Sequence, residues 1–170
     1  QSFYETGNRL VYQSKKDYED WLNRLSQFTE NIYTFLEINK EGLEKGYTQP
    51  KLVTRGVISQ IDAIINSDIE LNPYLKVFLE ANEEYFSKDE KEDLINDAKQ
   101  LIQKEINPAY ESLNNFLKNQ YLINSRESIG IKDIPDGKKY YEQLAKHYTT
   151  TDLTPDEIHD IGLREIQRIR

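Results

Sequence analysis

The stretch from Ser87 to Leu117, SKDEKEDLINDAKQLIQKEINPAYESLNNFL, decides the fold class of this chain. Its apolar residues recur every three or four positions, which places them on one face of an α-helix. Ser87 followed three residues later by Glu90 is the pattern of a capping box, so we expect the helix to begin there. Pro108 interrupts the pattern, because proline removes a backbone hydrogen bond and clashes with the preceding turn. We therefore predict a long central helix that is kinked near Asn107, or two helices that meet there.

Helix-like spacing also extends to both sides of this stretch. On the N-terminal side, we expect a helix that begins at Ser14, where Asp17 can complete a capping box. It should run toward Gly42 and Gly46, and a second helix should follow Thr48 and Pro50. The faces that we expect these two helices to bury are Tyr18, Trp21, Leu22, Leu25, Phe28, Ile32, Phe35 and Leu36 in the first, and Val53, Val57, Ile61, Ile64 and Ile65 in the second.

Shorter segments complete the helical pattern. Residues 66–73 are expected to form a loop, and a short helix should follow around residues 74–79. On the C-terminal side, Ile134-Pro135-Asp136-Gly137 predicts a tight turn before a helix from about Lys138 to His147. Thr154-Pro155-Asp156-Glu157 combines a cap, a proline at the first helical position and a glutamate at the third, so it predicts the start of a last helix.

The fold class that follows is all-α, because sustained alternation of apolar and polar residues is missing. We expect residues 1–170 to form a single helical region, either a multi-helix bundle or part of a larger helical shell. The sequence begins at Gln1, contains no methionine, and ends at Arg170 within a helical pattern. We interpret it as a fragment of a larger protein that is cut at both ends.

Composition limits the possible partners. The net charge of −8 disfavours nucleic acid and anionic membrane surfaces as partners. No stretch approaches the roughly 20 apolar residues of a membrane span. The absence of cysteine excludes disulfides, thiolate metal ligands and cysteine nucleophiles from this chain.

The sequence contains no recognisable catalytic motif. A nucleophile elbow and a phosphate-binding loop are both missing. His147 and His159 are the only histidines, and no carboxylate stands at the usual helical offset from both. We interpret them as surface or helix-end residues, with metal ligation completed by other parts of a larger protein as the alternative. We therefore expect no catalytic residue, no metal ligand and no cofactor in this chain.

Tyrosines gather around the predicted turn at Tyr121, Tyr140, Tyr141 and Tyr148. Half-buried packing with the hydroxyl at the surface is the ordinary behaviour of such residues. The alternative is that they line a groove for a peptide or another substrate. Tyr140 and Tyr141 are the residues that we select as candidate substrate contacts.

The order of several short motifs resembles a bacterial family, the domain of unknown function 885 (DUF885). The resemblance runs from about Gly42 to Arg170, with Gly46 and Pro50 at its start, and is strongest after Ile106. The matching stretches are Ile106-Asn107-Pro108-Ala109-Tyr110 with Leu113 and Leu117, then Gly130 and Ile134-Pro135-Asp136-Gly137 with Tyr140-Tyr141, and finally Tyr148-Thr149-Thr150 and Thr154-Pro155-Asp156-Glu157-Ile158-His159-Asp160-Ile161-Gly162-Leu163.

The resemblance implies a long helical protein similar to helical zinc peptidases. The family's metal site is a His-Glu-x-x-Pro-Gly-His stretch C-terminal to the matched block, and nothing in this chain matches it. We therefore expect an N-terminal, non-catalytic helical segment of a zinc-dependent peptidase that forms part of a substrate cleft. Its partners would be the remainder of the parent chain and short peptides, and zinc would be bound by the full-length parent. The alternative is a non-enzymatic helical module that binds a protein or peptide.

Overall fold

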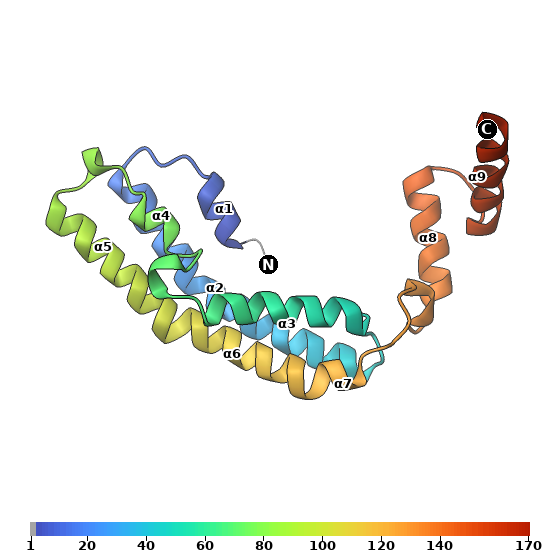
Figure 1. Ribbon diagram of the computed structural model, residues 1–170, viewed down its shortest axis with the longest axis horizontal. Helices are drawn as coiled ribbons and strands as arrows, with labels where there is room; N and C mark the ends of the chain where they lie inside the picture. The colour runs from blue at the N-terminus through green and yellow to red at the C-terminus, as the bar shows by residue number, and fades with distance from the viewer. Residues whose placement is uncertain (1–2) are drawn as a thin grey trace.

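The computed structural model describes residues 3–170, which form an elongated, curved assembly of α-helices (Figure 1). No β-strand occurs within residues 3–170, so the all-α prediction is confirmed. None of the helices in this range is long and apolar enough to cross a membrane. The helices are α1 (Phe3–Arg9), α2 (Lys15–Glu44), α3 (Lys51–Ile65), α4 (Lys76–Leu79), α5 (Lys88–Leu101), α6 (Asn107–Phe116), α7 (Leu122–Asn124), α8 (Gly137–Thr149) and α9 (Pro155–Ile169).

The central helix does not break at its proline. Helices α5, α6 and α7 follow one another through two π-helical turns, η3 (Ile102–Ile106) and η4 (Leu117–Tyr121). The amide of Asn107 donates to the carbonyl of Ile102, five residues earlier, so the chain already has a wider turn where Pro108 enters. The expectation of two separate helices is wrong, and Figure 1 shows one gently curved helix.

A bundle of α2, α3 and the central helix contains the hydrophobic core, and α4 packs against α5 (Figure 1). Each large apolar side chain that is fully buried contributes about 1.5–3 kcal/mol to folding. The core residues with no exposed surface come mainly from the central helix, which confirms its amphipathic pattern. They are Leu25, Leu75, Phe78, Ala98, Ile102, Ile106 and Ala109.

Four of the five residues predicted for the buried face of α3 are buried or pack partly buried against the core. Thr54, Ile58 and Ile61 are its buried residues, whereas Val53 is 46% exposed. In α2 the predicted face is largely correct, although Phe35 is 52% exposed. The spacing of valines and isoleucines therefore located the helices and most of their buried faces, but it missed Thr54 and Ile58.

Two of the three predicted capping boxes are confirmed. Ser87 caps α5 with Glu90, and Thr154 caps α9 with Glu157. At the start of α2, Ser14 is the N-cap residue, but its side chain accepts no hydrogen bond from the helix. The Asp17 carboxylate instead accepts from the Gln13 amide at 2.8 Å and from the Ser14 hydroxyl at 3.0 Å.

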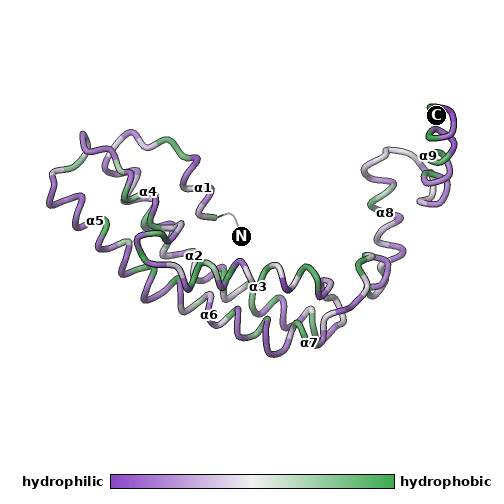
Figure 2. The backbone as a smooth tube through the Cα atoms, viewed as in Figure 1, coloured by the Kyte–Doolittle hydropathy of each residue, from purple (hydrophilic) through white to green (hydrophobic). Residues whose placement is uncertain are grey.

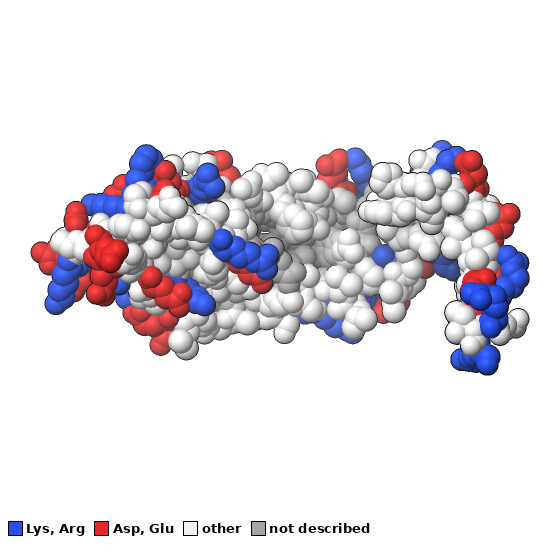
Figure 3. Space-filling model, turned by 90° about the horizontal axis from the view of Figure 1, so that it is seen from above, with Lys and Arg blue, Asp and Glu red and all other residues white. Residues whose placement is uncertain are grey.

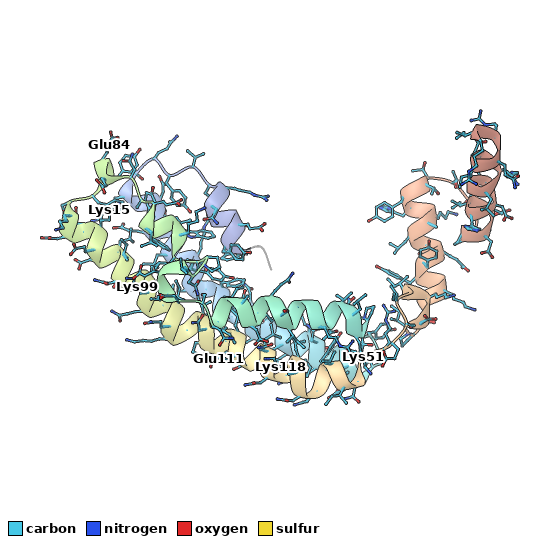
Figure 4. All side chains as sticks on the ribbon, viewed as in Figure 1. Lys15, Lys51, Glu84, Lys99, Glu111 and Lys118 are labelled. Atoms are coloured by element: carbon cyan, nitrogen blue, oxygen red, sulfur yellow. The ribbon has the colours of Figure 1, made fainter. Side chains whose placement is uncertain are left out.

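The Lys15–Glu90 ion pair joins the beginnings of α2 and α5, with 2.8 Å between Nζ and Oε1 (Figure 4). Lys15 and the Ser87 amide and hydroxyl lower the pKa of Glu90 from 4.5 to about 2. Because the folded pKa is lower than the unfolded one, this stabilisation is present above about pH 4.5 and is lost as the pH falls toward 2. We predict that the melting temperatures of wild type and Glu90→Gln, measured against pH, converge across this window. A difference that persists at its lower end would contradict the assignment.

Candidate functional site

Helices α8 and α9 form an arm that extends from one end of the bundle (Figure 1). No residue of α9 is buried, and Gly137 is the only buried residue of α8. Hydrophobic residues nevertheless recur along both helices, as Figure 2 shows for α9. The arm thus presents apolar side chains that nothing within residues 3–170 covers.

Arg126 holds the connection between the bundle and the arm. Its Nε donates to the carbonyl of Thr48 at 2.9 Å, and its Nη1 donates to the carbonyls of Ser128 and Gly130 at 2.7 Å each. Its own carbonyl accepts from the amide of Lys51 at 2.9 Å. One guanidinium therefore fixes the loop that leads to the arm against the loop between α2 and α3.

Gly137 explains the tight turn at the start of the arm. A Cβ atom at this position would lie 2.2 Å from the carbonyl oxygen of Ile131, so any side chain would collide with backbone. Asp136 adopts a left-handed conformation at φ 54°, and the Gly137 amide donates to the carbonyl of Ile134 at 2.9 Å. The predicted turn is present, and it packs the 3₁₀ turn η5 (Ile131–Asp133) directly on α8.

The two candidate tyrosines are both exposed on α8. Tyr140 is 49% exposed and Tyr141 is 48% exposed. Only Tyr140 lines an open hollow on the helix surface, which it shares with Leu144 and His147, two residues on the same face. Tyr141 lies outside that hollow. The structure therefore separates the two candidates, although they are adjacent in the sequence. The hollow is lined by Asp136, Lys139, Tyr140, Gln143, Leu144 and His147.

The two histidines lie on different helices. His147 is in α8 and stacks edge-on against Tyr148, with ring centroids 5.1 Å apart, whereas His159 is in α9. Within residues 3–170, no three His, Cys, Asp or Glu side chains are grouped so that they could hold a metal ion. The described residues do not fit the zinc site that the family resemblance implies.

An apolar groove that no sequence pattern predicted lies between α2 and α3. We call it the α2–α3 groove; it has a volume of about 350 Å³. Phe35 from α2 and Val57 from α3 lie on its two sides. Its lining residues are Phe28, Asn31, Ile32, Phe35, Val57, Gln60, Ile61, Ile64, Tyr110 and Leu113.

Tyr110 lines this groove and is paired with Tyr74, which lies buried behind it outside the groove lining. Their hydroxyl oxygens are 2.7 Å apart, and burial raises the pKa of both groups. Both side chains therefore stay neutral at physiological pH. Ala109, Tyr110, Leu113 and Leu117, from the first motif of the resemblance, are all buried, so this motif has a packing role.

Comparison with known proteins gives a family. A family model described as "Bacterial protein of unknown function (DUF885)" matches residues 1–170, the whole chain. This chain belongs to the DUF885 family. Among proteins with curated descriptions, none matches it.

A solved structure similar to this DUF885 chain is described as "the putative lipoprotein from Colwellia psychrerythraea". The two share 26% sequence identity and superpose with a TM-score of 0.86 over 96% of the DUF885 chain. The matched region is 28% of the Colwellia protein. The DUF885 chain thus spans little more than a quarter of that protein.

Proposed function

We propose that these residues form a non-catalytic helical segment of a zinc-dependent peptidase and contribute one wall of its substrate cleft. The observation that carries the proposal is Tyr140, half-exposed in a hollow on an arm that Arg126 and Gly137 hold in place. A tyrosine in this setting offers a flat apolar ring and a hydroxyl, which suit the side chain and the backbone of a short peptide.

Two further observations support the proposal. The chain belongs to DUF885, and it spans only 28% of the Colwellia protein that it resembles. The described residues group no three metal-binding side chains, so zinc ligands would come from polypeptide outside this region. We accordingly assign no step of peptide hydrolysis to these residues. Their role would be to bind and orient substrate.

A second candidate function is a non-enzymatic helical module that binds a peptide or protein partner. The α2–α3 groove favours it, because an apolar groove between helices can receive one face of a partner helix. The two candidates differ in one measurable property: only the first requires peptide hydrolysis by the full-length protein.

Steady-state hydrolysis of short peptides by the full-length protein tests whether Tyr140 contacts the substrate. We expect Tyr140→Ala to raise KM by about 5- to 10-fold with little change in kcat, because the ring contributes to substrate binding. The matched control is Tyr33→Ala on α2, which is 45% exposed but distant from the arm in sequence and on another helix. Equal changes in both variants, or none in Tyr140→Ala, would contradict a substrate contact at Tyr140.

A further inference from the structure

Gly56 stands in the middle of α3 without a steric reason for being glycine. A Cβ atom at this position would meet nothing within 4 Å, and the residue is exposed. Glycine in a helix interior is less stable than alanine, because it loses more backbone freedom on folding. The residue therefore weakens α3 here without any contact within residues 3–170 that requires it.

The surface around Gly56 is uncharged and continuous with the α2–α3 groove. Helical spacing places Gly56 next to Val53 and to Gln60, which is part of the groove lining, and places Leu52 and Ala63 on its other side. The charged residues of α3 lie along the opposite edge, where Asp62 pairs with Lys118 at 2.7 Å and Lys51 pairs with Glu127 (Figure 4). Seen from above α3, a broad uncharged and hollowed area separates the more heavily charged ends (Figure 3).

This surface has the features of a close contact between helices. The groove can receive apolar side chains, and an exposed glycine beside it lets a second helix backbone approach closely. Phe35 and Val53, 52% and 46% exposed, flank the approach and would be covered by the same contact. A charged ligand would lose its hydration here without gaining a partner, so the chemistry selects an apolar helix face.

The length of the similar Colwellia protein indicates where such a helix would come from. The Colwellia protein shares this fold at a TM-score of 0.86, and the shared region is only 28% of its length, so most of that protein lies outside it. A helix on the same polypeptide is held near the groove at a high effective concentration, which favours it over a separate molecule.

We propose that the α2–α3 groove and Gly56 seat the apolar face of a helix from polypeptide outside these 170 residues. The contact is structural and independent of zinc or peptide hydrolysis, so it can stand or fall separately from the proposed function. This contact would explain why residue 56 is a glycine and why Phe35 is exposed within residues 3–170.

Thiol accessibility in the full-length polypeptide tests whether a helix covers the α2–α3 groove. A cysteine is introduced as Gln60→Cys in the groove lining, or as Arg55→Cys on the opposite edge of α3 as the matched control, with any other cysteine replaced. We expect a maleimide to label the groove thiol at least about tenfold more slowly than the control thiol. Equal labelling rates would overturn the proposal. Protection that disappears on dilution would also overturn it, because a second copy would then be the occupant.

Substitution of Gly56 provides an independent measurement with opposite signs in two proteins. In the 170-residue chain, Gly56→Leu should raise the melting temperature by about 1 to 4 °C, because leucine favours the helix over glycine and a Cβ atom here meets nothing within 4 Å. In the full-length polypeptide, Gly56→Leu should lower it by about 3 °C or more, because the side chain would separate the packed helices. An unchanged or higher melting temperature of the full-length Gly56→Leu variant would contradict close packing at this position.

Discussion

Replacing Tyr110 by alanine is expected to lower the free energy of unfolding by about 3–5 kcal/mol, the range for removing a large buried aromatic side chain. Tyr110 is 6% exposed and packs near Phe28 and Tyr74, so its removal leaves a cavity beneath the α2–α3 groove. Urea denaturation followed by circular dichroism measures the change. A loss below about 1 kcal/mol would show that the residue is not part of a packed core.

Conservative variants separate the hydroxyl contribution from that of the ring. Tyr110→Phe should cost about 1–2 kcal/mol, because the buried Tyr74 hydroxyl loses the partner that lies 2.7 Å away. Adding Tyr74→Phe removes both hydroxyls, and the double variant should be less destabilised than the sum of the single ones. Additive losses would contradict a hydrogen bond between the two groups.

Arg126→Ala is expected to lower the free energy of local opening of the connection between bundle and arm by about 2–3 kcal/mol. The reason is that three carbonyls lose a charged donor. Hydrogen exchange should show roughly 30- to 150-fold faster exchange of the Lys51 and Gly137 amides, while core amides of α6 change little. Arg126→Lys should behave similarly, because one ammonium group cannot reach Thr48 and both loop carbonyls together.

The matched control for this prediction is Lys132→Ala, which removes an exposed positive charge from the same connection. We expect it to leave exchange of the two amides unchanged. Equal effects in the Lys132 and Arg126 variants would indicate that net charge, and not the guanidinium geometry, holds the arm.

The parts of the fold that were predicted correctly depend on local chemistry. The capping boxes at Ser87 and Thr154 act within four residues, and the turn before Gly137 requires glycine for a backbone contact only six residues away. Such features are readable from a single sequence because every interacting group is close along the chain.

The parts that were missed depend on contacts between distant segments. Helix α1 packs closely on Trp21 through Gly7, where a Cβ atom would lie 2.4 Å from the Trp21 ring. No short sequence motif predicts that contact. The burial of Thr54 and Ile58 in α3 and the contacts of Arg126 with Thr48 likewise depend on which helices become neighbours. The long central helix was predicted correctly, but the π turn that lets it continue through Pro108 was not, because no sequence pattern marks such a turn.

The candidate site likewise contains features that the sequence predicted and features that it did not. Tyr140 and Tyr141 were selected as adjacent members of one motif, but the helix turns about 100° per residue and directs them differently. Only Tyr140 shares a hollow with Leu144 and His147, which are one and two turns further along. The α2–α3 groove could not be found from sequence, because its lining residues follow the same spacing as core residues.

The metal content of the full-length protein, purified without chelator, tests the central claim most directly. If these residues belong to a zinc-dependent peptidase, elemental analysis should find about one tightly bound zinc per polypeptide, and removing it should abolish hydrolysis of short peptides. A full-length protein that contains no zinc and takes up none from solution would contradict the account, and would leave the helical binding module as the better description.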